Sequence, residues 1–485
     1  MAPPNRIIID TDPGVDDILA MLLAFSAKPE ELEVLLISVT FGNVDVQNCL
    51  RNVISMFHTI EKEQAWRRKN GHAPGFETLG MFKPIVAVGA EEPLADQLMM
   101  ADYFHGVDGL GGIHESHPHL TPAQTWQSLL EAAKTSESTE IDEAAEALVD
   151  FSRHPKSLFT PSETPAHQEI LRLLRENEKD SITIVAIGPL TNIALAAAAD
   201  PETFLRVKEV VVMGGTIETP GNVRQPPPPI HPPPFLPPPP RFQLTKAPQT
   251  PLRTSLNIRN QITPVAEFNA YADSIAAARV YALTSPHPNS TMPPAPPAPP
   301  GKQVDDAPPP FLANYPDRLS RQLPVTLFPL DITTSHLLTR GQFRETVAPL
   351  LDAGSPLAEW VAAFLSSTFG KIESLSARAA GDRVGLALHD PLCVWYMLTR
   401  RSPAWTLAPH GPEDIRVETS GQWTRGMCVV DRRNRRRRED DVEGGEVPGD
   451  TGNWLGKGSG NRVGRVVGTP GEDKFGAYLL HRIFG

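Results

Sequence analysis

Cysteine is scarce in this sequence, and its scarcity excludes two kinds of stabilisation. The 485 residues include only three cysteines, Cys49, Cys393 and Cys428. An odd number at such wide spacing builds no disulfide framework and does not match the ligand spacing of a zinc site. The chain is therefore expected to work in a reducing compartment.

The sequence also lacks an excess of basic charge, and we expect no targeting signal. Its 57 Asp and Glu exceed its 45 Lys and Arg, so the formal net charge is −12. This balance argues against a generic nucleic-acid-binding protein, which needs a basic surface. No charged and apolar leader precedes the first β-branched run at residues 7–9. We expect a cytoplasmic protein. The arginine run at 435–438 leaves nuclear access open, although the acidic residues beside it favour a solvated loop.

A membrane-spanning helix is not expected either. Residues 181–199 carry no charge and are long enough to raise the question. Gly188-Pro189 and Thr191-Asn192 interrupt this stretch near its middle. A buried strand, a turn and an alanine-rich helix account for it better.

The apolar runs of the chain predict its fold class. Strands are expected at residues 7–9, 32–40, 84–89, 182–187, 209–213 and 327–332, and helices at 18–25, 192–199 and 472–484. The strands are apolar throughout and alternate with helices, which is typical of a parallel sheet covered on both faces. We expect one α/β domain over residues 1–485, with an open, mostly parallel, Rossmann-like sheet.

Proline is abundant, and it concentrates in segments that interrupt this pattern. There are 51 prolines, and 13 of them lie in the 39 residues 224–262. So much proline permits neither a helix nor a central strand, so this insertion is expected to be disordered; a polyproline II ligand is the alternative. We expect a surface excursion at 125–180, a Pro-rich loop at 286–324 and a charged, Gly-rich loop at 432–462.

The strongest chemical signal is the octet of residues 10–17, DTDPGVDD. Four carboxylates follow a predicted strand directly, at the sheet edge where ligands of open α/β folds bind. Acids this close repel one another unless they share a cation, and an all-oxygen ligand set suits Mg²⁺ or Ca²⁺. Helix capping is the alternative for Asp16 and Asp17, but it does not explain Asp10 and Asp12.

Further motifs follow the octet in a recognisable order. They are 40–43 (TFGN), 105–111 (HGVDGLG), 186–192 (AIGPLTN), 212–215 (VMGG), 221–222 (GN), 266–269 (AEFN) and 389–391 (HDP). With the octet, this set resembles the inosine-uridine-preferring nucleoside hydrolase family, and its fungal members most. Joining residue 223 to residue 263 restores an uninterrupted family-like motif, so we hypothesise that 224–262 is a translated intron.

The resemblance implies a Ca²⁺-dependent hydrolase that cleaves the N-glycosidic bond of ribonucleosides, uridine first or inosine, through an oxocarbenium-like transition state. It also implies a homo-oligomer, a dimer or a tetramer, and no nucleic-acid or membrane partner. The implied metal ligands are Asp12 (also the general base), Asp17, Asp390 and the carbonyl of Ile187, with Asp10 in support. The implied ribose-binding residues are Asp16, Asn43, Asn222, Glu267 and Asn269. His389 would protonate the leaving base, because histidine titrates near neutrality.

Several of these assignments have structural alternatives. His389 could be a buried structural histidine, and Asn43 could serve only its turn. His105 and the Gly-rich loop that it begins could likewise serve only to form turns. The alternative for the whole chain is a catalytically impaired nucleoside- or Ca²⁺-binding protein whose Pro-rich segments recruit partners.

Overall fold

A central sheet organises the chain. The computed structural model describes residues 5–121, 158–221, 264–294, 309–375, 380–433, 449–456 and 458–485. Within these residues the sheet has nine strands, and each neighbouring pair is parallel except β10 with β13. In sheet order they are β10 (Thr406–Leu407), β13 (Gly464–Gly468), β7 (Val325–Phe328), β6 (Glu209–Met213), β5 (Ile182–Ala186), β1 (Arg6–Thr11), β2 (Glu33–Val39), β3 (Ile85–Val88) and β4 (Thr160–Pro161). The expected open, mostly parallel sheet is confirmed.

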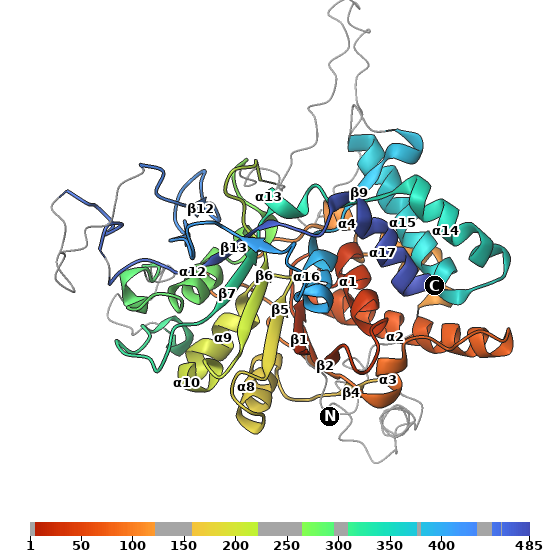
Figure 1. Ribbon diagram of the computed structural model, residues 1–485, viewed down its shortest axis with the longest axis horizontal. Helices are drawn as coiled ribbons and strands as arrows, with labels where there is room; N and C mark the ends of the chain where they lie inside the picture. The colour runs from red at the N-terminus through yellow and green to blue at the C-terminus, as the bar shows by residue number, and fades with distance from the viewer. Residues whose placement is uncertain are drawn as a thin grey trace, which may run out of the picture.

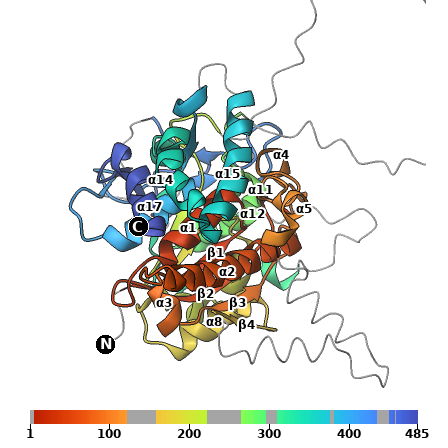
Figure 2. The ribbon, with the colours of Figure 1, turned by 90° about the vertical axis from the view of Figure 1, so that its right-hand side faces the viewer.

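Helices cover both faces of the sheet (Figure 1). One face packs against α1 (Val15–Phe25), α2 (Val46–Lys69), α15 (Pro356–Leu375), α16 (His389–Thr399) and α17 (Glu472–Phe484), and Figure 2 looks onto this layer. The other face packs against α8 (Ala166–Glu176), α9 (Thr191–Ala199), α10 (Pro201–Phe204) and α12 (Ser274–Ala282). Strand β1 supplies both cores, because Ile7 and Ile9 point to the first layer and Ile8 to the second. This alternation explains why the strand is apolar at three successive positions, residues 7–9.

Shorter elements connect these layers. The helices are α3 (Glu77–Met81), α4 (Asp102–His105), α5 (Ile113–Ser116), α11 (Phe268–Ala272), α13 (Leu330–Thr333) and α14 (Arg340–Asp352). The 3₁₀ turns are η1 (Pro118–Leu120), η2 (Pro288–Ser290), η3 (Pro310–Leu312) and η4 (Gly381–Arg383). Two small antiparallel pairs join β8 (Leu337–Thr339) to β9 (Gly385–Ala387) and β11 (Arg416–Val417) to β12 (Cys428–Val429). None of the helices in the described ranges combines the length and the apolar character needed to cross a membrane.

Two sequence-based expectations are wrong in part. The expectation of a surface excursion at 125–180 is wrong for residues 158–180, because β4 joins the sheet and α8 buries Ile170 and Leu174 in the core. The apolar residues of α8 recur at helical spacing, which was the missed signal. The strand expected at 327–332 is β7, which ends at Phe328 before Pro329, and α13 follows. Proline has no backbone N–H to extend the ladder.

The other expected excursions lie largely outside the described residues. Residues 122–157 and 222–263 are not described, so the expectation for 224–262 stays a prediction. The described part of 286–324 contains the 3₁₀ turns η2 and η3, and it buries Tyr315 and Leu323. The described residues of 432–462 form turns.

Candidate active site

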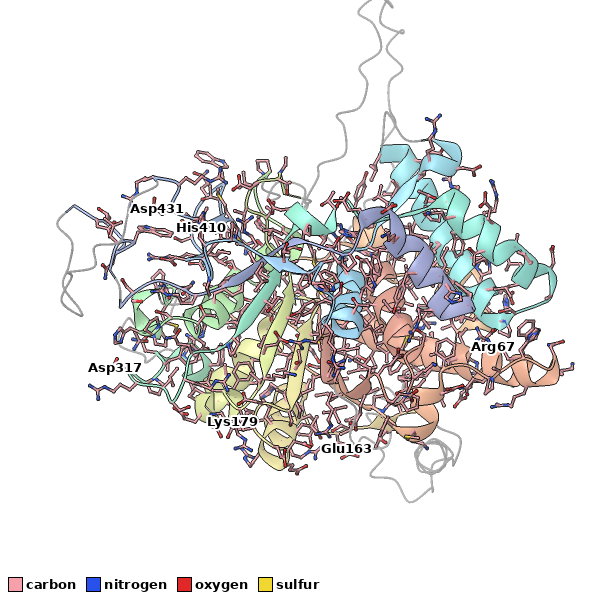
Figure 3. The ribbon with its side chains drawn as sticks, in the orientation of Figure 1. Arg67, Glu163, Lys179, Asp317, His410 and Asp431 are labelled. Atoms are coloured by element: carbon pink, nitrogen blue, oxygen red, sulfur yellow. The ribbon has the colours of Figure 1, made fainter. Side chains whose placement is uncertain are left out.

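The octet lies at the carboxyl end of β1, where the sequence places it. Lys179, which precedes β5, lies at the lower edge of the molecule in Figure 3, so the central strands run upward from there. Asp10 is in β1, Asp12 lies just beyond it, and Asp16 and Asp17 form the first turn of α1. Helix α16 packs against α1 and brings in Asp390 (Figure 1). Five carboxylates from two distant parts of the chain therefore gather at one edge of the sheet.

Three of these acids are close enough to share one cation. Carboxylate oxygens of Asp16, Asp17 and Asp390 all lie within 4.8 Å of one another, and all three residues are buried. Burial, and then repulsion by neighbouring carboxylates, raises the pKa of Asp16 to about 7 and that of Asp390 well above its ordinary value. An arrangement that holds like charges together in a buried place favours protonation or a bound cation. Asp16, which was assigned to ribose, thus belongs geometrically to the acid cluster.

Asp12 lies beside this cluster and keeps one oxygen free. Its Oδ2 accepts a hydrogen bond from the backbone N–H of Asn43 at 2.8 Å, whereas its buried Oδ1 has no hydrogen-bond partner among the described residues. Burial, followed by the charge of Asp17, raises its pKa well above the ordinary value. A Cβ at Gly42 or Gly188 would overlap the Asp12 carboxylate, so both glycines are needed for this close approach. A buried carboxylate oxygen without a hydrogen-bond partner is well suited to bind a metal ion.

Asp17 and Asn43 fix the geometry of the octet. Asp17 Oδ1 accepts a hydrogen bond from the Thr11 hydroxyl at 2.6 Å. Asp17 Oδ2 accepts from the N–H of Gly14 at 3.0 Å and from Asn43 Nδ2 at 2.9 Å. Asn43 Nδ2 also lies 3.0 Å from the carbonyl oxygen of Asp12. Asn43 therefore does more than form a turn, because its side-chain amide contacts both Asp12 and Asp17 and orients them.

Asp10 lies in β1, two residues before Asp12. Its Oδ1 accepts hydrogen bonds from the Ser38 hydroxyl and, at 3.0 Å, from Asn192 Nδ2, while its buried Oδ2 has no partner in the described part of the chain. Burial raises the pKa of Asp10 to about 7 despite these donors. Asn192 connects β1, β2 and α9 through these contacts, and the supporting role of Asp10 stays a prediction.

Helix α11 brings two further predicted residues to the same edge. Glu267 caps the helix: its Oε1 accepts from Asn269 N–H at 2.7 Å, and its Oε2 accepts from Gly215 and Ala270 N–H at 2.8 and 3.0 Å. Asn269 Nδ2 donates to the carbonyl of Ile187 at 3.1 Å, the carbonyl assigned to the metal. The ribose and metal roles of these three residues stay predictions. Asn222 lies outside the described residues.

Two histidines lie at the site, and their environment corrects one expectation. His389 Nδ1 is 2.7 Å from the Thr333 hydroxyl, and burial lowers its pKa to about 4. Titration near neutrality is therefore wrong for this imidazole. His105 Nδ1 accepts a hydrogen bond from Val15 N–H at 3.3 Å, and burial, with the charge of His389 second, lowers its pKa to about 3. The charge of His389 acts on the His105 ring, so the two imidazoles lie near each other.

Sequence reasoning missed the partners that orient these groups. Thr11, Ser38, Asn192 and Thr333 each bind a predicted site residue through a side chain. Thr11 and Asn192 lie inside the motifs already singled out, and Ser38 is the one polar residue of the apolar run of β2 beyond Glu33. Thr333 gave no signal, because its contact with His389 exists only in the folded chain.

Comparisons with known proteins bear on the family and the fold of the chain. The model of the inosine-uridine preferring nucleoside hydrolase family matches residues 7–447. Pyrimidine-specific ribonucleoside hydrolase RihA of Salmonella paratyphi B is 26% identical over 432 residues, which are 88% of this chain and 88% of that protein. Uridine nucleosidase 1 of Arabidopsis thaliana is 31% identical over 220 residues, 45% of this chain and 47% of its own. A solved plant nucleoside hydrolase, PpNRh1, shares the fold with a TM-score of 0.58 at 20% identity, covering 100% of both chains.

Proposed function

This chain belongs to the inosine-uridine preferring nucleoside hydrolase family, and on that premise we propose that it hydrolyses pyrimidine ribonucleosides, uridine first, with a bound Ca²⁺. Hydrolysis of the N-glycosidic bond of ribonucleosides is the activity of the family, and the chain is an enzyme of this kind. The pyrimidine preference rests on the names of two relatives, a pyrimidine-specific hydrolase and a uridine nucleosidase. A homo-oligomer is proposed from the family resemblance, and light scattering tests it.

The buried acid cluster with its unpartnered Asp12 oxygen is the observation that carries the metal part of the proposal. Asp12, Asp17 and Asp390 are the proposed side-chain ligands, with the carbonyl of Ile187 as the fourth, and Asp16 lies close enough to Asp17 and Asp390 to contribute. All are oxygen donors, the set that Ca²⁺ prefers. When bound, the cation would hold a water molecule and lower its pKa.

Side chains of this protein are proposed to carry out the remaining steps: accepting a proton from water, binding the ribose and assisting departure of the base. Asp12 accepts a proton from the attacking water on its free Oδ1, while the bond from this water oxygen to the ribose carbon forms and the bond to the base nitrogen breaks. The side chains of Asp16, Asn43, Glu267 and Asn269 are the proposed contacts of the ribose hydroxyls. His389 stays neutral at pH 7 because of its lowered pKa. We propose that its Nδ1 accepts a hydrogen bond from the Thr333 hydroxyl and that its Nε2, which then carries the single ring proton, donates a hydrogen bond to the leaving base. The base departs as an anion and takes a proton from solvent.

Ribose release by purified full-length protein tests the reaction and its base preference. We expect turnover of both uridine and inosine with Ca²⁺, and a higher kcat/KM for uridine. A higher value for inosine would contradict the pyrimidine preference and leave the hydrolase activity standing. A folded, Ca²⁺-loaded protein that releases ribose from neither substrate, but binds uridine in calorimetry, would instead favour the impaired binding protein.

Removal of residues 224–262 is expected to leave a folded enzyme. The described residues on either side of this segment meet: Gly221 N–H donates to the carbonyl of Pro264 at 3.1 Å. After deletion, Asn222, Val223 and Thr263 would close a short loop between ends that are already joined, and loops of that length are common. We expect kcat/KM at least equal to that of the full-length chain and a thermal midpoint no lower.

An inactive shortened protein beside an active full-length one would show that the segment takes part in function. Sequencing the mature transcript decides the separate hypothesis that the segment is a translated intron. A message that carries the segment would overturn that hypothesis.

A further inference from the structure

One side chain of α2 joins the two loops that carry the site. Asn52 is fully buried, and its Nδ2 donates to the carbonyl of Pro13 at 2.8 Å and to the carbonyl of Asp108 at 2.9 Å. Pro13 lies inside the octet, and Asp108 lies in the Gly-rich loop that begins at His105. We propose that Asn52 is a positioning residue for catalysis, which holds the Asp12–Asp17 turn and the His105 loop in one fixed relation. The inference rests on the proposed function for its kinetic readout.

The orientation of the Asn52 amide is determined by its remaining partner. His114 Nε2 lies 2.6 Å from Asn52 Oδ1, and His114 Nδ1 lies 2.6 Å from the Thr121 hydroxyl. Because Oδ1 can only accept, Nε2 carries the proton, and Nδ1 accepts from Thr121. A flipped amide would place Oδ1 against two carbonyl oxygens, neither of which can donate. Every polar atom of Asn52 and of the His114 ring is thus used, as a buried polar network requires.

The loop that Asn52 contacts is held together by hydrogen bonds to the Asp108 carboxylate. Asp108 Oδ1 accepts from the N–H groups of Leu110 and Gly112 at 2.9 and 2.8 Å, and Oδ2 accepts from His114 N–H at 3.0 Å. Three segments meet at Gly109, where a Cβ would lie 2.8 Å from Asn52 Nδ2 and 3.2 Å from the Pro13 carbonyl oxygen. A displacement at Asn52 therefore moves the loop as a unit.

The loop also contacts the octet at its other end. The carbonyl of His105 accepts from Gly111 N–H at 2.7 Å, and its ring accepts from Val15 N–H. A Cβ at Gly14 would lie 2.6 Å from His105 Nδ1 and 2.8 Å from Asn43 Nδ2, so the loop packs directly on the turn. Asn52 and His105 thus attach the loop to the turn at two points. Losing the first leaves two buried carbonyls without donors and frees the loop to shift against Asp12.

Two Asn52 variants and one matched control test the inference. Asn52→Leu keeps the approximate shape and removes the donor, and Asn52→Ser is smaller and keeps one hydroxyl donor. The control is Ser55→Ala, one turn along α2: Ser55 is equally buried, but its hydroxyl donates at 2.8 Å to the carbonyl of Arg51 in the same helix. The readouts are the thermal midpoint, kcat and KM per folded molecule at saturating Ca²⁺, and the Ca²⁺ dissociation constant from calorimetry.

We expect both Asn52 variants to lose kcat by about 10- to 100-fold, because displacements of ~1 Å at a site reach that size. Ca²⁺ affinity falls by about tenfold, in the range found when partners of metal ligands are lost. Ser55→Ala lowers only the thermal midpoint. Folded Asn52 variants whose kcat and Ca²⁺ affinity both stay within twofold of the unsubstituted chain would overturn the inference. If the unsubstituted chain hydrolyses no nucleoside, the proposed function fails separately, and the Ca²⁺ affinities alone still decide the role of Asn52.

Discussion

Asp12→Asn is expected to lower kcat by about 10²- to 10⁴-fold, the usual contribution of a general base, while the protein stays folded. The amide oxygen of Asn can still accept the hydrogen bond from Asn43 N–H, so the turn keeps its shape. Asparagine cannot take a proton from water, and it removes one negative charge from the proposed cation site. Ribose release from uridine under saturating Ca²⁺ measures the loss, and circular dichroism checks the fold.

The same substitution is expected to raise the stability of the metal-free protein. Burial and the charges of Asp17 and Asp16 raise the pKa of Asp12, so its ionised form works against the folded state. Asp45→Asn is the matched control, because Asp45 is exposed and caps α2, a role that Asn fills equally well. A folded Asp12→Asn protein with kcat within tenfold of the unsubstituted chain would refute the assignment of Asp12 as the base.

Removing the metal is expected to abolish turnover and to lower the thermal midpoint. A cation that binds only the folded chain stabilises it by about 2.7 kcal/mol when its free concentration is 100 times its Kd. Chelation removes this stabilisation and leaves the five buried acids at Asp10, Asp12, Asp16, Asp17 and Asp390 to repel one another. Thermal unfolding with excess Ca²⁺ and with chelator measures the difference, and assays of the same samples follow turnover.

The size of this Ca²⁺ effect should grow from pH 5 to pH 8. In the metal-free protein the pKa values of Asp10 and Asp16 are raised to about 7. Between the unfolded value near 4 and about 7 the folded state holds more protons than the unfolded state, so its stability falls as the pH rises. Bound Ca²⁺ favours the ionised carboxylates and cancels this fall.

Two further observations check this pH dependence. Ca²⁺ binding near pH 6.5 should release protons, which a weakly buffered titration detects. The lowered pKa values of His105 and His389 act in the other direction: as the pH falls below about 6.5, these imidazoles take up protons in the unfolded chain but stay neutral in the folded one, so stability falls with the pH. Their effect is expected with and without Ca²⁺ and largely cancels from the difference. A Ca²⁺ effect on the thermal midpoint that shrinks toward pH 8 would contradict the assignment of these acids to a cation.

Much of the central sheet could be predicted from the sequence, because its strands are continuous apolar runs. The run at 209–213 became β6 (Glu209–Met213), and the terminal helix lies where it was expected, at Glu472–Phe484. Helix α8 was missed because its apolar stripe lies in a polar surrounding, and only the face that it covers shows that the stripe is buried. The composition of a segment gives its average polarity, whereas packing in the folded chain determines which side of the segment is buried.

The octet is the part of the site that the order of residues alone predicts most directly. Four carboxylates after a strand, with Pro13-Gly14 between them, specify an acidic turn at the carboxyl edge of a parallel sheet whatever the rest of the chain does. Only the tertiary structure brought Asp390 to this turn, through the packing of α16 on α1. It also decided that Asn52 would join two loops and that His389 would be neutral at pH 7. The physical reason is that burial and long-range proximity set hydrogen bonds and pKa values, and neither is a property of a residue's neighbours in sequence.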